Sequence, residues 1–161
     1  MMIERARTEI RSTVEDARAA VWNLRHSEEG GDVSAALARL TTRVAAESGL
    51  TVELHSYGAA RPLGPDAARG LLLSVREALS NAVRHAAAKR ITVSLTFTHD
   101  GLEVGVADDG CGFDWRPHTS GEDRHYGLIG MQERIETLGG RFELESAPGR
   151  GTRVGFTIPS S

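Results

Sequence analysis

Four polar side chains in the segment REALSNAVRHA could take part in metal and phosphate chemistry. Glu77, Asn81, Arg84 and His85 follow one another at offsets of four, three and one, and the first three share one face if the segment is helical. An asparagine oxygen suits Mg²⁺, which takes few protein ligands and keeps water and phosphate oxygens for the rest. Arg84 and His85 could then meet phosphates. The same residues also fit the solvated face of an amphipathic helix, so this motif alone decides nothing.

A second motif, VADDGCGFD, joins the end of a predicted strand to a glycine-rich turn. Asp108 closes the strand, and Gly110 and Gly112 follow at alternate positions. Glycines let the backbone turn sharply and approach a flat ligand, while a carboxylate accepts a hydrogen bond from an exocyclic amine. This combination indicates an adenine site. An ordinary Asp-Gly turn is the alternative reading of the same residues.

Two further glycine motifs follow. In HYGLIGMQER, Gly127 and Gly130 stand at the predicted start of a helix, where free backbone N–H groups attract phosphate. In SAPGRGTRVGF, Gly151 and Thr152 stand at the last turn of the chain. A glycine-capped helix and a tight hairpin would explain each motif separately. All four motifs occur in a fixed order, each on the kind of element that its chemistry needs, and chance explains that poorly.

Hydrophobic periodicity predicts the elements that position these motifs. An apolar stripe of 4-3-4-3 spacing predicts a helix over residues 3–24, and glycines near Gly30 indicate a linker. Asp32 and Gly49 are the expected ends of a second helix, and a third runs from Pro65 to about residue 88. Strands are expected over 50–56 and in two hairpins, 91–98 with 102–108 and 141–147 with 152–159, and a fourth helix over 128–139.

Strands gathered into hairpins with helices between them predict an α+β fold. We expect a two-layer α/β sandwich: a mixed, mostly antiparallel sheet of about five strands with three helices on one face, a flexible lid over about 113–126, and an additional N-terminal helix.

Composition excludes several classes of function. The 161 residues carry a net charge of −3, with 40% hydrophobic and 25% charged residues, so no broad basic face is expected to bind nucleic acid. No apolar run is long enough for a membrane helix, and the start of the chain lacks the apolar core of a signal peptide. Cys111 is the only cysteine. These features agree with a cytoplasmic location and with no membrane contact by this segment.

The four motifs together resemble the catalytic domains of bacterial sensor histidine kinases, in the branch that usually signals to response regulators with helix-turn-helix output domains. The resemblance spans roughly residues 70–158 and extends to a superfamily with gyrase, a heat-shock chaperone and mismatch-repair ATPases. It implies ATP and Mg²⁺ as cofactors. It also implies that Asn81 binds Mg²⁺ and that Glu77, at the position of a catalytic carboxylate in related ATPases, orients a water or the metal.

The remaining implied roles concern the nucleotide. Asp108 would bond the adenine amine, and Thr152 would assist it through a water. The other residues that the resemblance assigns to ATP are Gly110 and Gly112 at the adenine floor, Gly127, Leu128 and Gly130 at the phosphates or the lid hinge, and Arg84 and His85 at phosphate oxygens.

The resemblance also predicts a division of the chain. Residues 1–29 are similar to the second helix of a dimerisation hairpin, and 30–161 to the catalytic ATP-binding domain. The acceptor histidine is expected on the other hairpin helix, outside this chain, so His26 is interpreted as a linker residue and little activity is expected of the chain alone. The expected partners are a response regulator and, in the full-length protein, a second copy; a membrane anchor, if present, belongs to the parent protein.

Two other functions remain open at this point. The first is an anti-sigma-factor serine kinase of the same superfamily, which needs no dimerisation hairpin and leaves the seam at 3–24 unexplained. The second is a nucleotide-binding regulatory module without phosphoryl transfer, against which the presence of Glu77 and Asn81 counts.

Overall fold

Three helices and five strands form the part of the chain that the computed structural model describes, residues 32–85, 87–113 and 123–160. In chain order they are α2 (Val33–Ser48), β1 (Thr51–Tyr57), α3 (Pro65–His85), β2 (Arg90–Thr98), β3 (Gly101–Asp108), α4 (Asp123–Thr137), β4 (Arg141–Ser146) and β5 (Thr152–Pro159). The helix predicted over 3–24 and most of the predicted lid lie outside the described residues, so the domain division at residue 30 stays a prediction.

Helix α2 begins and ends where the sequence predicts. The Asp32 side chain accepts a hydrogen bond from the Ala35 backbone N–H at 3.1 Å, which satisfies one of the amides left without a partner at a helix start. At the other end Gly49 has a φ of 74°, and its N–H donates to the Ala45 carbonyl at 3.0 Å. Glycine adopts this left-handed conformation without a steric penalty, and so it ends the helix.

The five strands form one sheet in the order β1-β2-β3-β5-β4. Strand β1 pairs with β2 in parallel, and every other pairing is antiparallel, so the predicted mixed, mostly antiparallel sheet and both hairpins are confirmed. Because β3 and β5 are antiparallel neighbours, the end of one lies beside the start of the other, with Asp108 opposite Thr152. The glycine-rich motif after Asp108 and the last turn before Thr152 therefore meet at the same end of two neighbouring inner strands.

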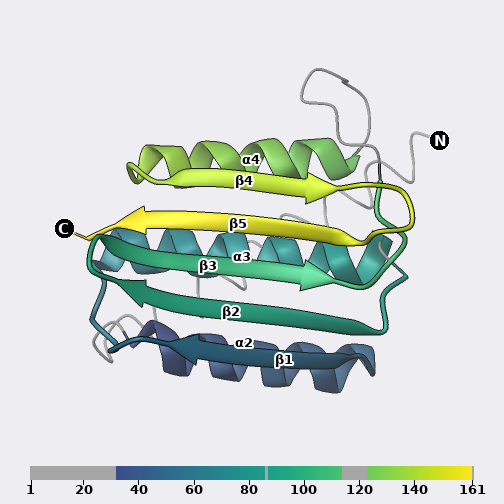
Figure 1. Ribbon diagram of the computed structural model, residues 1–161, viewed down its shortest axis with the longest axis horizontal. Helices are drawn as coiled ribbons and strands as arrows, with labels where there is room; N and C mark the ends of the chain where they lie inside the picture. The colour runs from purple at the N-terminus through teal and green to yellow at the C-terminus, as the bar shows by residue number, and fades with distance from the viewer. Residues whose placement is uncertain (1–31, 86, 114–122, 161) are drawn as a thin grey trace, which may run out of the picture.

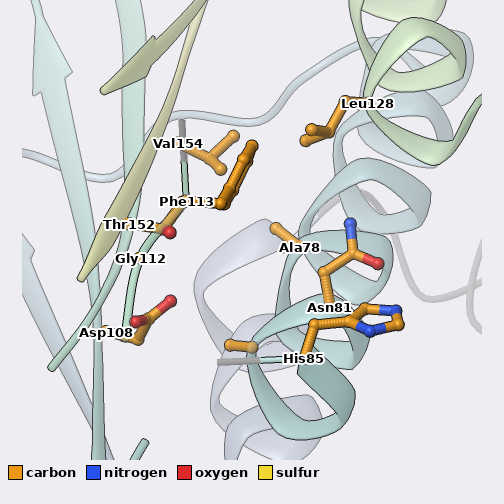
Figure 2. Close-up of a pocket in the computed structure, with 10 residues that line it drawn as sticks. Ala78, Asn81, His85, Asp108, Gly112, Phe113, Leu128, Thr152 and Val154 are labelled. Atoms are coloured by element: carbon orange, nitrogen blue, oxygen red, sulfur yellow. The ribbon is translucent and has the colours of Figure 1, made fainter. Parts of the chain in front are cut away.

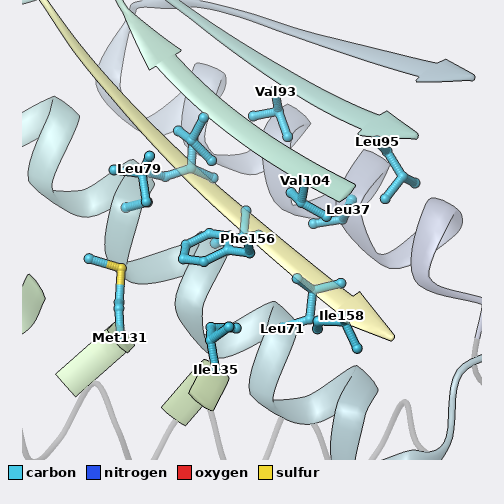
Figure 3. Close-up of a cluster of buried hydrophobic side chains, with 14 of the residues drawn as sticks. Leu37, Leu71, Leu79, Val93, Leu95, Val104, Met131, Ile135, Phe156 and Ile158 are labelled. Atoms are coloured by element: carbon cyan, nitrogen blue, oxygen red, sulfur yellow. The ribbon is translucent and has the colours of Figure 1, made fainter. Parts of the chain in front are cut away.

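The three helices cover one face of this sheet, as predicted (Figure 1). Every second residue of β2, β3 and β5 faces them and is almost fully buried: Ile91, Val93, Leu95, Leu102, Val104, Val106, Val154, Phe156 and Ile158. All nine belong to one hydrophobic cluster with residues of the helices, and Figure 3 shows Val93, Val104 and Phe156 of the sheet together with Leu37, Leu71 and Met131 of the helices. Truncating one such side chain to alanine typically costs about 2–5 kcal/mol.

Helix α4 begins at Asp123 rather than at Leu128. The prediction that Gly127 and Gly130 open this helix is therefore wrong. Glycine disfavours a helix interior by only about 1 kcal/mol, and burial of Leu128, Met131 and Ile135 in the core outweighs that preference. None of the helices in the described part of the chain is long and apolar enough to cross a bilayer.

Candidate functional site

A pocket opens where β3 ends and β5 begins, between the sheet and the C-terminal half of α3 (Figure 2). The empty space inside it and at its open mouth comes to about 410 Å³. Its lining comes from α3, α4, β5, the end of β3 and the loop after β3: Ala78, Asn81, Ala82, His85, Asp108, Gly112, Phe113, Leu128, Thr152 and Val154.

Helix α3 forms one wall of the pocket. Asn81 and His85 lie four residues apart on its inner face, beside the small side chains of Ala78 and Ala82, which leave room for a ligand close to the helix. The Asn81 Nδ2 atom is buried, and it has no hydrogen-bond partner within the described residues. Leaving a buried polar group unpaired costs about 1–3 kcal/mol, so an acceptor oxygen brought within reach of this N–H₂ group would recover that free energy.

Glu77 lies one turn before Asn81, against helix α4. A Cβ atom placed on Gly127 would be 2.7 Å from Glu77 Oε1 and 3.8 Å from Asn81 Nδ2. Gly127 therefore lets α4 approach the carboxylate and the amide together, which is a different role from the open helix end that we predicted for it. Carboxylate and amide oxygens are ligands that Mg²⁺ prefers, so the side chains of Glu77 and Asn81 fit the implied metal.

The opposite side of the pocket is built around Asp108, half-buried at the end of β3. Its Oδ1 accepts a hydrogen bond from the Gly110 N–H at 2.9 Å, and the Thr152 backbone N–H is a second donor. Burial raises the pKa of the Asp108 carboxyl, and these two backbone donors partly offset that effect. A hydrogen-bond donor from a ligand would further favour the charged form.

Two glycines let the loop after β3 and the turn between β4 and β5 touch. Gly112 has a φ of 63°, and a Cβ atom on it would lie 2.0 Å from the Ala147 carbonyl oxygen. A Cβ atom on Gly151 would lie 2.2 Å from the Asp108 carbonyl oxygen. The Gly149 N–H closes the contact by donating to the Cys111 carbonyl at 2.6 Å. The backbone on this side of the pocket is thus held by close contacts at Gly112 and Gly151, where any residue larger than glycine would clash.

The neighbouring carboxylate, Asp109, faces away from the pocket lining and has a structural role. It accepts hydrogen bonds from the backbone N–H groups of Lys89 at 2.8 Å and Arg90 at 3.0 Å. These two bonds lower the pKa of the Asp109 carboxyl. The two adjacent aspartates therefore have different roles: Asp108 borders the pocket, and Asp109 holds the chain segment between α3 and β2 by hydrogen bonds.

The structure brings Asn81, His85, Asp108, Gly112, Leu128 and Thr152 to one pocket, and five other predicted residues do not line it. Glu77 and Gly127 contact one another behind it, and Gly110 lies beneath Asp108 as a hydrogen-bond donor. Gly130 faces open space. The exposed Arg84 donates from Nε to the Ser80 hydroxyl at 2.9 Å on its own helix.

Sequence reasoning missed the apolar half of the lining. Ala78, Ala82, Phe113 and Val154 border the pocket, yet none was named as a site residue. Ala78 stands three residues before Asn81, and Ala82 stands four after Ala78 and three before His85, so the helical period could have placed both on the side of the helix that carries Asn81 and His85. Phe113 directly follows Gly112, at the first residue of the predicted lid. Val154 looks like any other core residue of its strand, and no local signal distinguishes it.

Residues 66–161, more than half of the chain, match the family of histidine kinase-, DNA gyrase B- and HSP90-like ATPases, and the chain belongs to this family. Among its relatives, the sensor histidine kinase YhcY of Bacillus subtilis is 32% identical over 145 residues, which are 89% of this chain and 36% of that protein. An uncharacterized sensor-like histidine kinase of Chloroflexus aurantiacus is 37% identical over 100 residues, covering 60% of this chain and 17% of that protein.

The fold has counterparts among solved structures. The histidine kinase domain of a blue-light activated histidine kinase from Erythrobacter litoralis superposes with a TM-score of 0.67 at 23% identity, covering 80% of this chain and 61% of that one. A mycobacterial sensor histidine kinase, MprB, gives a TM-score of 0.62 at 20% identity. At such identities the likeness is one of fold. The chain spans only 17% to 36% of the first curated relatives.

Proposed function

We propose that this chain is the Mg-ATP-binding catalytic domain of a two-component sensor histidine kinase. In the whole protein it would transfer the γ-phosphoryl group of ATP to a histidine of the dimerisation domain, for relay to a response regulator. The observation that carries the proposal is the convergence of Asp108 and Asn81 on one pocket from opposite sides. A nucleotide has a base with an exocyclic amine at one end and phosphates at the other, and this pocket offers a partner for each.

The sheet side of the pocket fits the base. The Asp108 carboxylate would accept a hydrogen bond from the adenine amine, with Thr152 beside it, while Phe113, Leu128 and Val154 supply apolar contact for the ring. The burial that raises the pKa of Asp108 also removes competing water, which strengthens a hydrogen bond to its charged form.

The helix side fits the triphosphate and its metal. Asn81, with Glu77 behind it, would hold Mg²⁺, which when bound neutralises charge on the phosphate oxygens. His85 would contact a phosphate oxygen from the same face of α3. Arg84, bonded here to Ser80, stays a predicted phosphate contact that the proposal does not need. Phosphoryl transfer depends mainly on alignment and charge neutralisation, so these residues act by holding ATP in place.

Titration calorimetry with ATP, with and without Mg²⁺, tests the binding half of this proposal. We expect the unaltered chain to bind ATP more tightly with Mg²⁺, and Asn81→Ala to lose most of that metal-dependent gain. Gln132→Ala is the matched control, because this amide on α4 bonds Glu136 and lies outside the pocket lining. Equal binding by the chain and by Asn81→Ala with Mg²⁺ would contradict the metal assignment.

Labelling with [γ-³²P]ATP tests the transfer. When the chain is joined to the dimerisation helices of its parent, we expect acid-labile, base-stable phosphate, the signature of phosphohistidine. Acid-stable phosphate on an anti-sigma-factor antagonist would instead identify the serine kinase, and ATP binding without any labelling would identify the regulatory module. The cytoplasmic location, the response regulator and the homodimer belong to the same proposal, as properties of the whole protein.

A further inference from the structure

Ser146, the last residue of β4, connects three parts of the proposed base site without lining the pocket itself. Its Oγ accepts a hydrogen bond from the Phe113 N–H at 2.9 Å and donates to the Gly151 carbonyl at 3.1 Å. It also lies 2.9 Å from Thr152 Oγ1. Phe113 and Thr152 both border the pocket. One half-buried hydroxyl thus ties the loop after β3 to the start of β5.

The single hydrogen of this hydroxyl limits the directions that its bonds can take. A serine hydroxyl has one hydrogen to donate and two lone pairs to accept with. Either hydroxyl can be the donor between Ser146 and Thr152; when Ser146 gives its hydrogen to the Gly151 carbonyl, the hydrogen between the two hydroxyls comes from Thr152. In that arrangement Thr152 Oγ1 keeps only lone pairs for the pocket.

An acceptor-only threonine beside a carboxylate makes this edge of the pocket selective. In that arrangement Asp108 and Thr152, which both border the pocket, offer only acceptors, and these suit the two hydrogens of an exocyclic amine. A purine with a carbonyl oxygen in place of that amine would bring a third acceptor to the same position and would keep only its ring N1–H as a donor. Leaving such groups unpaired in a pocket is a strong source of discrimination.

We propose that Ser146 is a specificity-determining positioning residue, which sets the Thr152 hydroxyl as an acceptor and so selects a 6-aminopurine nucleotide over a 6-oxopurine one. This inference rests on the proposed function, because it assumes that a purine nucleotide occupies the pocket. Ser146 acts through Thr152 and Phe113 and does not itself touch the ligand.

The test compares the affinities of ATP and ITP, which carries an oxygen in place of the 6-amino group, for the chain and its variants. In Ser146→Ala the Thr152 hydroxyl loses its acceptor and becomes free to donate into the pocket. We expect the preference for ATP over ITP to fall about fivefold, the range of one hydrogen bond. Ser146→Thr, which keeps the hydroxyl, should restore the preference to within twofold.

Two further variants distinguish a loss of the preference for ATP over ITP from general damage to the pocket. Thr152→Val removes the hydroxyl that Ser146 orients, so adding Ser146→Ala to it should leave the ATP-to-ITP preference unchanged. Ser94→Ala removes a half-buried serine hydroxyl of β2 outside the pocket lining, and it should leave both affinities unchanged.

The outcomes are distinct. Equal weakening of ATP and ITP in Ser146→Ala, or no change in either, would overturn the role of Ser146 while leaving the proposed function intact. Failure of the unaltered chain to bind ATP would overturn the proposed function and this inference with it. Thermal unfolding of each variant establishes that the compared chains are folded.

Discussion

The two sides of the pocket are built differently. On the sheet side, the Asp108 and Ser146 side chains accept hydrogen bonds from the backbone N–H groups of Gly110 and Phe113, and Gly112 makes a backbone contact too close for any side chain. On the helix side, the Asn81 amide has a buried nitrogen without a partner in the described part of the chain, and the Glu77 carboxylate lies against Gly127 of α4. The sheet side is therefore formed before any ligand arrives, and the helix side is completed by one.

This difference leads us to expect two kinds of failure. Changes to the glycine contacts of the sheet side should damage the fold and the base site together, because the same contacts support both. Changes on the helix side should spare stability and affect phosphate and metal binding. Each experiment below tests one part of that comparison.

The largest effect is expected from Gly112→Ala. The added Cβ would lie 2.0 Å from the Ala147 carbonyl oxygen, at a φ of 63°, and backbone on both sides cannot yield cheaply. We expect a loss of unfolding free energy of about 3 kcal/mol or more, measured by urea denaturation, and no detectable ATP binding. Gly149→Ala is the matched control: its φ is 78° but the added Cβ meets nothing within 4 Å, so only about 1 kcal/mol should be lost. Equal losses would show that the close contact is unimportant.

Asp108→Asn should weaken ATP binding about 100-fold at neutral pH, because a charge-assisted hydrogen bond to the amine is lost. The pKa of the Asp108 carboxyl is raised by burial, so the affinity of the unaltered chain should fall as the pH drops through that raised value and the carboxylate is protonated. The affinity of Asp108→Asn should lack this step. Calorimetric titrations between pH 4 and 8 measure both.

The stability of the ligand-free chain should respond to Asp108 in the opposite sense. A carboxyl with a raised pKa stabilises the folded state below its unfolded pKa, and that contribution is lost as the pH rises through the folded value. Near neutral pH, Asp108→Asn should therefore melt at a temperature equal to or above that of the unaltered chain. A clear decrease in melting temperature would mean that the charge is needed for the fold.

Gly127→Ala tests the helix side. The added Cβ would lie 2.7 Å from Glu77 Oε1, the end of a side chain that can move, so stability should hold while Mg²⁺-dependent ATP affinity falls about tenfold. Gly130→Ala, on the same helix with nothing within 4 Å of the added atom, should only stabilise, by up to about 1 kcal/mol. If Gly127→Ala unfolds the chain instead, the helix side is as tightly built as the sheet side.

The smallest effect is expected from Asp109→Asn, outside the pocket lining. Hydrogen bonds from the backbone of Arg90 and Lys89 lower the pKa of this exposed carboxyl. Its contribution to stability is thus present above the unfolded pKa and lost as the pH falls through the folded value. We expect a decrease in melting temperature of at most a few degrees at pH 7, no difference from the unaltered chain in strong acid, and unchanged ATP affinity.

Signals local in the chain predicted most of the fold. Asp32 and Gly49 mark the ends of α2 through bonds to residues three or four positions away, and the alternating residues of β2 and β3 identify a hairpin with a short turn. The predicted start of α4 was wrong because glycine usually marks a helix end. Gly127 instead lies inside the helix and lets it approach Glu77, which is far away in the sequence.

The site was predictable only in part, for the same reason. Motif order indicated that Asn81, Asp108 and Thr152 belong to one site, and the pocket brings them together. The predicted end of the strand singled out Asp108, but nothing local assigns a role to Asp109, and only the three-dimensional structure shows that it accepts hydrogen bonds from the backbone of Lys89 and Arg90. Ser146 is equally inconspicuous, because its partners are Phe113 and residues across a turn.

The contact between Gly112 and Ala147 has a consequence for the order of folding. The loop that follows β3 can take its final shape only after the C-terminal hairpin has docked, since the hairpin supplies the carbonyl against which Gly112 rests. Contacts so distant in sequence form slowly because chain closure must precede them. A nucleotide seated on this loop would in turn hold the hairpin, so ligand should slow amide hydrogen exchange along β5 more than along the remote edge strand β1.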